Sequence, residues 1–333
     1  MAALKPPEYS VYIVSGITKY NVTKAVTSLE RSEPEGQLAQ RVTIQLANVK
    51  VGDEMIASKL NARDRIFIYA NDGEKEAEVF RGFLWTRVRS DSIKENEVKY
   101  VCYDNLIYFQ ESEDSLYFAS GKSTKDVVAA ICEKWGIALS YSYSSIVHSK
   151  LPLRGTLADI ITDDILDPVK KQKKVKYVIQ SKEDTMIVKP AGLNSTLYQF
   201  SAGKNIIKTA SGWTMDGVVT QVIVTGKADD DDREPIEATL RGNTSKYGTL
   251  QRILRRSEGT TLEEAKLEAQ STIDENGAPK WEYEITCPDI PWLRRGDKIR
   301  VNAGGISGKK IITEIDRTAD SKTREMTLTL EDE

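Results

Sequence analysis

Two short stretches of the chain, DRIFI at residues 64–68 and DKIRV at residues 297–301, follow the same pattern. Each begins with an acid and a cation and continues as a short run with the composition of a strand. A glycine lies in the turn region beyond each stretch, Gly82 in the first copy and Gly308 in the second. The same residue types in the same order indicate that one strand unit occurs twice, once towards each end of the chain.

The two copies continue in the same order after the glycine. A second strand, a polar hairpin and a last strand ending in an acid are expected at residues 83–88, 89–91 and 98–104, and again at 311–315, 316–318 and 326–331. The turn residues that hairpins require in all-β domains would also produce such a likeness. We favour a duplication, in which one barrel domain occurs twice in a single chain.

The N-terminal part of the chain has the pattern of antiparallel strands. Residues 42–46 alternate apolar and polar side chains, which is the period of a half-buried strand. Residues 65–69 are followed by Asn71-Asp72-Gly73, a hairpin signal. Strands at this spacing are typical of an antiparallel sandwich or barrel.

The middle of the chain has a different pattern, with apolar residues at helical spacing. A first helix is expected from the cap at Ser123 and Asp126 to Gly136. A second helix is expected from Thr156 until Pro168 ends it. The basic run at residues 170–174 would suit nucleic acid or an acidic partner, but we interpret it as a solvated linker.

Strand patterns return from about residue 200, interrupted by one helix. That helix is expected between a capping box at Thr261 and Glu264 and a stop at Asn276-Gly277. The sequence therefore predicts a β-rich α+β protein. A first antiparallel β-barrel at residues 1–112 and a second at 200–333, which carries the helix, flank a small α+β domain at 113–199.

Composition narrows the range of functions. The 333 residues include 47 Lys and Arg against 50 Asp and Glu, a formal charge of -3. A duplex DNA-binding surface needs an excess of cations, so this balance argues against one. No apolar run approaches the roughly 20 residues of a membrane span, and no signal peptide precedes the first strand. We therefore expect a protein that is made and used without Sec export and that assembles in the cytoplasm.

Reactive residues are few, and none forms a recognisable site. Cys102, Cys132 and Cys287 are far apart, so we expect three buried thiols rather than a zinc site or disulfides. His148 is the single histidine and lies in a polar stretch that we interpret as a solvated loop. The run SGKST at residues 120–124 lacks the first glycine of a phosphate-binding loop. No catalytic, cofactor-binding or metal-binding residue is predicted.

Two further stretches resemble a known protein family. YDNLIYF at residues 103–109, followed by STKDVV at 123–128, is similar to the junction between the first barrel and the helical domain of baseplate hub proteins. LRRGDKIRV at residues 293–301, with MTLTL at 326–330, is similar to their last barrel. These hubs (the late control D or tail hub family) occur in contractile-tailed phages, defective prophages and phage-tail-like bacteriocins. The likeness covers essentially the whole chain.

The resemblance implies a structural role. The barrels would be tail-tube-like, and the chain would form a homotrimeric, pseudo-sixfold ring that joins the tail tube to the central spike and lines the channel. The implied partners are the tail tube protein, the spike, other baseplate proteins and the tape measure protein, without sequence-specific nucleic-acid binding and without a membrane. No enzymatic activity and no cofactor are implied. The ring would assemble in the bacterial host cytoplasm and reside in the virion or tail-like particle.

One candidate site and one alternative function follow. The acidic run of Asp229, Asp230, Asp231 and Asp232 lacks the spacing of a calcium loop, and we interpret it as a solvated loop tip. These four residues are also our candidates for an interface or the channel, where they would repel phosphates. The alternative is a cell-wall-acting enzyme or carbohydrate-binding module built on β-barrels. Such a protein would use a carboxylate pair, or an aromatic platform such as Trp281 or Trp292.

Overall fold

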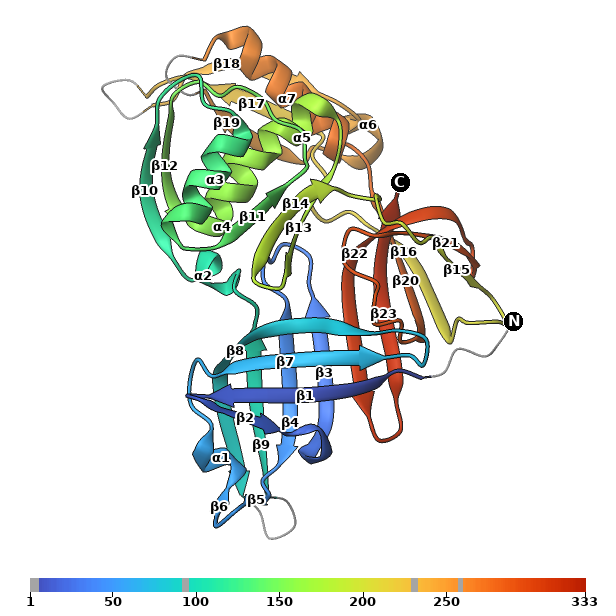
Figure 1. Ribbon diagram of the computed structural model, residues 1–333. Coiled ribbons are helices and arrows are strands. Elements are labelled where there is room, and N and C mark those ends of the chain that lie inside the picture. The colour runs from blue at the N-terminus through green and yellow to red at the C-terminus, as the bar shows by residue number, and fades with distance from the viewer. Residues whose placement is uncertain (1–5, 92–95, 229–232, 257–259) are drawn as a thin grey trace. The chain divides into compact units, whose positions relative to one another are not determined.

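The computed structural model describes residues 6–91, 96–228, 233–256 and 260–333 (Figure 1). The chain divides into two compact units. Unit 1 contains residues 1–210 and 284–333, and unit 2 contains residues 211–283.

The N-terminal part of unit 1 is an antiparallel sheet folded over its own core. Its strands are β1 (Glu8–Ser15), β2 (Thr18–Asn21), β3 (Val26–Glu33), β4 (Arg41–Ala47), β7 (Arg65–Asn71), β8 (Glu76–Asp91) and β9 (Asn96–Tyr103). Figure 1 shows β1, β7 and β8 crossing in front of β3, β4 and β9. Buried aliphatic side chains from both layers, such as Ile13, Ile44 and Ile68, fill the space between them. Short elements surround this sheet: η1 (Thr23–Ala25), β5 (Lys50–Val51), β6 (Glu54–Met55) and α1 (Ile56–Lys59).

The long strand β8 connects the two layers. Residues 76–83 pair with β7, residues 83–91 pair with β9, and a bulge lies between Leu84 and Thr86. A bulge bends its strand and increases the local twist, so one strand can belong to both layers. Gly82 lies at the bend, where a Cβ atom would collide with the Tyr103 carbonyl oxygen. The absence of a side chain at residue 82 therefore permits this crossing.

Strands β7, β8 and β9 form a first antiparallel meander. The C-terminal part of unit 1 contains a second meander of the same kind. It consists of β21 (Lys298–Ala303), β22 (Ile306–Asp320) and β23 (Arg324–Asp332), and β15 (Tyr198–Ser201) pairs with β21. β22 also pairs antiparallel with β3. The two meanders thus belong to one 13-stranded sheet, in which β16 (Lys208–Thr214) and β20 (Lys280–Pro288) follow β23. The strand order is an open path from β16 to β2, so pairing between the described strands does not close a barrel.

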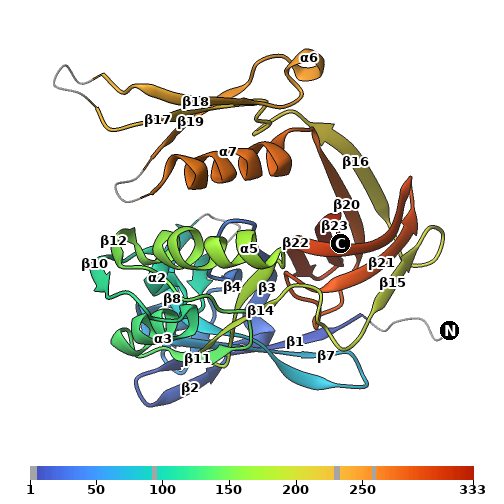
Figure 2. The same cartoon turned by 90° about the horizontal axis from the view of Figure 1, so that it is seen from above.

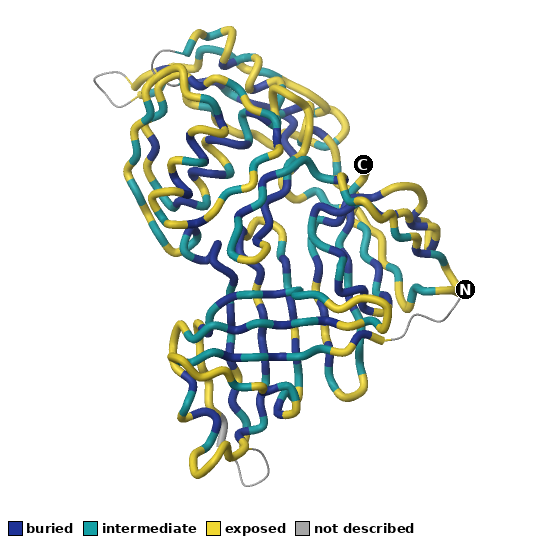
Figure 3. Tube along the Cα trace, in the orientation of Figure 1, coloured by how far each residue is buried: buried dark blue, intermediate teal, exposed yellow. Residues whose placement is uncertain are grey.

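Residues 316–318 and 89–91 were expected to form polar hairpins, and this prediction is wrong. Both segments belong to the long strands β22 and β8. The turn after β22 follows Asp320, whose side-chain oxygen accepts the N–H groups of Lys322 and Thr323. Polar residues at 316 and 318 reflect an exposed face of a continuing strand, because side chains alternate between the two faces. Figure 3 shows this alternation of burial along the strands.

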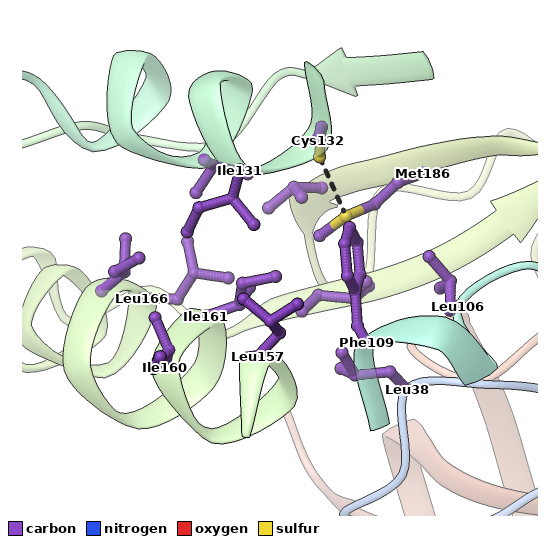
Figure 4. Packing of buried hydrophobic residues seen from close by; sticks show 14 of the residues in the cluster. Leu38, Leu106, Phe109, Ile131, Cys132, Leu157, Ile160, Ile161, Leu166 and Met186 are labelled. Carbon is purple, nitrogen blue, oxygen red and sulfur yellow. Dashed lines mark hydrogen bonds between the residues drawn. The ribbon is translucent and has the colours of Figure 1, made fainter. Parts of the chain in front are cut away.

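The α+β part of unit 1 packs helices against two small sheets. β10 (Glu113–Phe118) pairs with β12 (Leu151–Thr156), and β14 (Thr185–Pro190) lies between β11 (Ala138–Tyr141) and β13 (Tyr177–Lys182). The helices are α2 (Ile107–Gln110), α3 (Thr124–Lys134), α4 (Leu157–Asp159), the π-helical η2 (Ile160–Leu166) and α5 (Asp167–Lys173). Their apolar faces meet in a core that includes Phe109, Ile161 and Met186 (Figure 4). Ser123 and Asp126 form the expected capping box of α3.

Pro168 begins a helix instead of ending one. It occupies the first turn of α5, directly after η2, where a missing N–H group is tolerated. The helix continues to Lys173 and stops at Lys174, which has a left-handed conformation. Residues 170–173 are therefore the last helical turn rather than a linker, and their positive charges lie at the favourable end of the helix dipole.

Unit 2 is a three-stranded sheet covered by one helix. β17 (Gln221–Thr225) lies between β18 (Ile236–Arg241) and β19 (Gln251–Arg255), and α7 (Leu262–Asn276) packs on one face (Figure 2). The short helix α6 (Thr244–Tyr247) follows β18. Val222, Val224, Ala265 and Ala269 form the core. The predicted capping box of α7 is confirmed, since Thr261 and Glu264 bond reciprocally.

Candidate functional site: a charged junction between the repeated meanders

The two meanders begin with the same corner. In the first, the Asn61 N–H group donates to Asp64 Oδ2 at 2.7 Å; in the second, the Arg294 N–H group donates to Asp297 Oδ2 at 2.9 Å. The residue before each aspartate has a left-handed conformation: φ is 65° at Arg63 and 85° at Gly296. The acid that begins each repeat in the sequence therefore closes a turn.

Each corner is fixed to the long strand at the same place. In the second meander Gly296 N–H donates to the Ile312 carbonyl at 2.7 Å, and Ile312 N–H donates to the Asp297 carbonyl at 3.0 Å. In the first meander Leu84 makes the matching pair of bonds, with Arg63 at 2.8 Å and Asp64 at 2.9 Å. A bulge follows directly in both, after Leu84 and after Ile312. The two copies therefore share their backbone geometry as well as their sequence pattern.

The second corner holds the α+β part through two consecutive arginines. Arg294 Nε lies 2.8 and 2.9 Å from the two carboxylate oxygens of Glu33, and Nη1 donates to the Ser181 carbonyl at 3.3 Å. Arg295 donates to the main-chain carbonyls of Pro34, Gln37 and Ile179. Gln180 Nε2 donates in return to the Arg295 carbonyl at 2.6 Å. Strand β13 is thereby bound to the second meander and to the end of β3.

The first meander holds the tip of the same β13–β14 hairpin. Asp184 Oδ2 lies 2.6 Å from Arg65 Nη2 and 3.5 Å from Arg81 Nη1. Asn105 Nδ2 donates to the Asp184 carbonyl at 2.6 Å, and Ser181 Oγ donates to Asn105 Oδ1 at 2.6 Å. The β13–β14 hairpin is thus bound by both repeats. We call these contacts, made by Glu33, Arg65, Asp184, Arg294 and Arg295, the charged junction of unit 1.

A buried ion network lies beneath this junction. Arg317 Nε lies 3.2 Å from Asp289 Oδ1, and Arg317 Nη1 lies 3.7 Å from Glu33 Oε1. Tyr9 donates its hydroxyl to Asp289. Arg31, only 1% exposed, donates to the Pro291 carbonyl at 3.3 Å. Arg31 and Arg317 lie opposite one another in the β3–β22 pairing, and the carboxylates of Glu33 and Asp289 offset the charge of Arg317 there.

Burial and neighbouring charges shift the pKa values of the groups in and near this network. Burial alone would raise the pKa of Glu33, but Arg294 and Arg317 outweigh it and hold the pKa below its usual value. Burial lowers the pKa of Arg31. Asp104 is different: it accepts N–H bonds from Gln40 at 3.0 Å and Leu106 at 2.9 Å, yet burial raises its pKa to about 7.

The Asp104 carboxyl makes unfolding depend on pH. Its folded pKa of about 7 exceeds the unfolded value of about 3.9, so the folded state keeps a proton that the unfolded state loses. Raising the pH from 4 to 7 therefore favours unfolding. We expect the wild-type free energy of unfolding to fall relative to that of Asp104→Asn by up to about 1.4 kcal/mol per pH unit in this range. Urea unfolding of both proteins at pH 4.5–8 measures this, and parallel curves would contradict it.

His148 does not lie in a solvated loop, contrary to the sequence-based expectation. It is 7% exposed, and its Nε2 lies 2.9 Å from Thr124 Oγ1. Residues 146–148 lie over the start of α3, where the Ile146 carbonyl accepts the Thr124 N–H at 3.0 Å. Desolvation lowers the His148 pKa. The polar residues around His148 suggested a loop, but this segment caps the start of α3.

The remaining candidates give no reactive centre in the part of the chain that is described. Cys102, Cys132 and Cys287 are free and buried, as expected. Among the described residues, no group of three or more His, Cys, Asp and Glu side chains could hold a metal ion. Residues 229–232, predicted to face an interface or the channel, lie outside the described residues. No described helix has both the length and the apolar character needed to cross a bilayer.

Comparison with known proteins shows the family to which the chain belongs. A family model described as YQBQ-like matches residues 37–331, which include both corners and every residue of the charged junction except Glu33. The protein belongs to the YQBQ-like family. No curated protein matched this YQBQ-like chain in a sequence search.

Solved structures share its fold. A 43 kDa tail protein of prophage MuSo2 from Shewanella oneidensis is 14% identical, with a TM-score of 0.69 over 96% of this YQBQ-like chain and 98% of that chain. A tail protein from Neisseria meningitidis is 12% identical, with a TM-score of 0.70 over 98% and 97%. A type VI secretion component from E. coli, described as similar to the T4 tail proteins gp27 and gp5, is 7% identical, with a TM-score of 0.57 over 92% and 73%.

Proposed function

We propose that this chain is a structural baseplate hub of a contractile phage tail or tail-like particle. Three copies would form a homotrimeric, pseudo-sixfold ring that joins the tail tube to the central spike. The observation that carries the proposal is the repeated corner-and-bulge meander, because two like modules per chain let three chains present six similar surfaces. The two tube-like domains would span residues 1–112 and 200–333, with the α+β domain at 113–199 between them.

The similarity to tail proteins along nearly the whole chain supports this assignment. On it, the partners are the tail tube protein, the central spike, other baseplate proteins and the tape measure protein, and the ring assembles in the host cytoplasm. The role is mechanical and contains no enzymatic step. The charged junction would keep the two tube-like modules and the α+β part in fixed register when the tail contracts.

We assign the channel wall to the exposed face of the sheet that joins the meanders. Arg31 and Arg317 are paired in register and buried, so their strand neighbours face the other side. That side carries mainly acidic and hydroxyl groups: Ser28, Glu30, Ser32, Asp316, Thr318, Asp320, Glu325, Thr327 and Thr329. Arg41 and Lys99 are its main cations. A wall of this charge would repel phosphates and keep passing DNA from adhering.

Imaging of the purified protein tests the ring. We expect native mass spectrometry to show three copies of the 37.3 kDa chain, and electron microscopy to show threefold particles with sixfold character. A reconstruction with bound tube protein should place Glu30 and Asp316 towards the channel. A concentration-independent monomer would contradict the hub, and a ring with this sheet face on its outside would contradict the channel wall.

One observation favours the alternative of a carbohydrate-binding module. Trp281 is 56% exposed, and its ring lies within 10° of parallel to the Tyr283 ring, with centroids 6.4 Å apart. A flat aromatic pair of this kind suits the face of a sugar ring. Trp292 does not offer such a platform, since its indole N–H donates to Asp72 Oδ2 at 2.7 Å and Lys75 covers its ring at 4.3 Å. Retention on purified cell walls that Trp281→Ala abolishes would favour this function over the hub.

A further inference from the structure

The two repeats have the same strand order. In the first repeat the order is β7-β8-β9-β4-β3, and in the second it is β21-β22-β23-β20-β16. The registers also agree: directly beyond each bulge, Thr86 lies opposite Val101 on β9, and Glu314 lies opposite Thr329 on β23. Strand β16 is therefore the counterpart of β3, and the second half of β8 is the counterpart of the second half of β22.

One strand pairing joins the repeats within the chain. Strand β3 pairs with residues 315–320 of β22, on the edge of β22 that β21 leaves free beyond residue 311. The counterpart of this edge is the edge of β8 beyond residue 83, where the pairing with β7 ends. Among the described strands, none pairs with that edge of β8, and β16 has only β20 as a neighbour. The chain thus shows the pairing once, although it contains the strands for a second one.

The covered and the open edge differ in burial. Where β3 covers β22, the side chains of Ile315, Arg317 and Ala319 are buried. The matching segment of β8 is exposed from residue 85 to residue 89. Strand β16 is mainly exposed as well, and Trp213 near its end is 63% exposed. An unpaired edge strand is a template for pairing with another chain.

A hollow of about 320 Å³ lies where the open edge begins. Its lining includes Ala62, two residues before the corner aspartate, and Arg87, three residues after Leu84. Residues 295 and 315 hold the same positions in the second repeat, and both meet Glu33 at the end of β3. The main-chain N–H of residue 295 donates to Glu33 Oε2 at 3.4 Å, and residue 315 lies opposite Glu33 in the sheet. The end of β3 therefore fills, in the second repeat, the place that is hollow in the first.

We propose that β16 of one copy of this chain pairs antiparallel with residues 86–91 of β8 in a second copy, as β3 pairs with β22 within the chain. The C-terminal end of β16, with Trp213, then lies at the hollow. The two copies contribute different strands, so the interface is head-to-tail, and such an interface gives a ring when the rotation between copies closes. Only the number of copies rests on the proposed hub; the pairing itself rests on the repeat.

Cysteine crosslinking of the full chain tests this pairing. Val88, which is 55% exposed, receives one cysteine, and each residue from 208 to 214 receives the second in turn; the three native cysteines are buried. Opposite residues of antiparallel strands have Cβ atoms about 4.5–5.5 Å apart, and side chains alternate between faces. Mild oxidation should therefore join different chains at one position of β16, more weakly two residues away, and not at the positions between.

Tyr117 provides the matched control, since it is 68% exposed and lies on β10, outside both edges. Tyr117→Cys with the same β16 cysteines should give at least tenfold less covalent dimer than Val88→Cys. Circular dichroism shows that each variant keeps the wild-type fold. Links that alternate along β16 for Val88→Cys alone would establish the pairing. Links within one chain, or equal links from position 117, would overturn it.

Native mass spectrometry of the unoxidised protein separates this pairing from the hub. Three copies without any link between residue 88 and β16 would overturn the pairing and leave the hub standing. Alternating links in an assembly that is not a trimer would support the pairing and contradict the ring. A monomer at every concentration would contradict both.

Discussion

Replacing Glu33 with alanine will lower the free energy of unfolding by about 3–5 kcal/mol, the usual cost of removing one partner from a buried ion pair. The carboxylate lies 2.8 Å from Arg294 Nε and 3.7 Å from Arg317 Nη1. Without it, Arg294 loses its carboxylate partner and Arg317 keeps only Asp289. Equilibrium unfolding in urea, followed by circular dichroism, measures the loss.

A surface pair provides the matched control for Glu33. Glu237 bonds Arg256 through both carboxylate oxygens, but both side chains are partly exposed to water. Exposed pairs contribute little, so Glu237→Ala should have a small effect. Replacing both partners of the buried pair, as in Glu33→Leu with Arg294→Met, should recover part of the loss. Equal losses for Glu33→Ala and Glu237→Ala would show that the network is not a structural anchor.

Gly296→Ala should lower the free energy of unfolding by at least about 2 kcal/mol, because it combines two costs. The residue has a φ of 85°, which L-residues rarely adopt. The new Cβ would also lie 2.6–2.8 Å from three carbon atoms of Val178. Thermal unfolding measured by calorimetry gives the size of the loss.

The variant Gly305→Ala serves as a control that separates backbone strain from steric overlap. The φ of Gly305 is 82°, but a Cβ atom there would meet nothing within 4 Å, so Gly305→Ala carries the backbone strain alone. We expect Gly305→Ala to be clearly less destabilising than Gly296→Ala, and Val178→Ala to recover part of the loss in Gly296→Ala. If the two glycine variants lose the same stability, the contact between β13 and the second corner is softer than the structure indicates.

Local features of this fold could be read from the sequence. Asp64 and Asp297 marked both corners, because a turn that closes on a carboxylate has a short-range signature. Helix caps at Ser123 and Thr261 were equally accessible. Pro168 misled because its effect depends on whether it lies in the first turn of a helix or farther along. These successes and errors all concern residues within a few positions of one another.

The junction could not be predicted, because its contacts are long-range. Glu33 and Arg294 are separated by 261 positions, and no local pattern pairs them. The two arginines of LRRGD belong to a stretch that resembles hub proteins, but nothing local in it indicates that they bind Glu33. Asp104, with two main-chain N–H donors, had no sequence signal beyond its place at the end of a strand.

The pairing of β22 with β3 also determines how the molecule bears load. It covers six residue pairs, from Ile315 opposite Glu33 to Asp320 opposite Ser28. A force along the strands would stretch all the hydrogen bonds of this ladder together, in shear, whereas a force across them would open the bonds one by one. If contraction pulls along the strands, the two meanders will move together as one rigid sheet. A force applied to one meander will then be transmitted to the other without hinge motion between them.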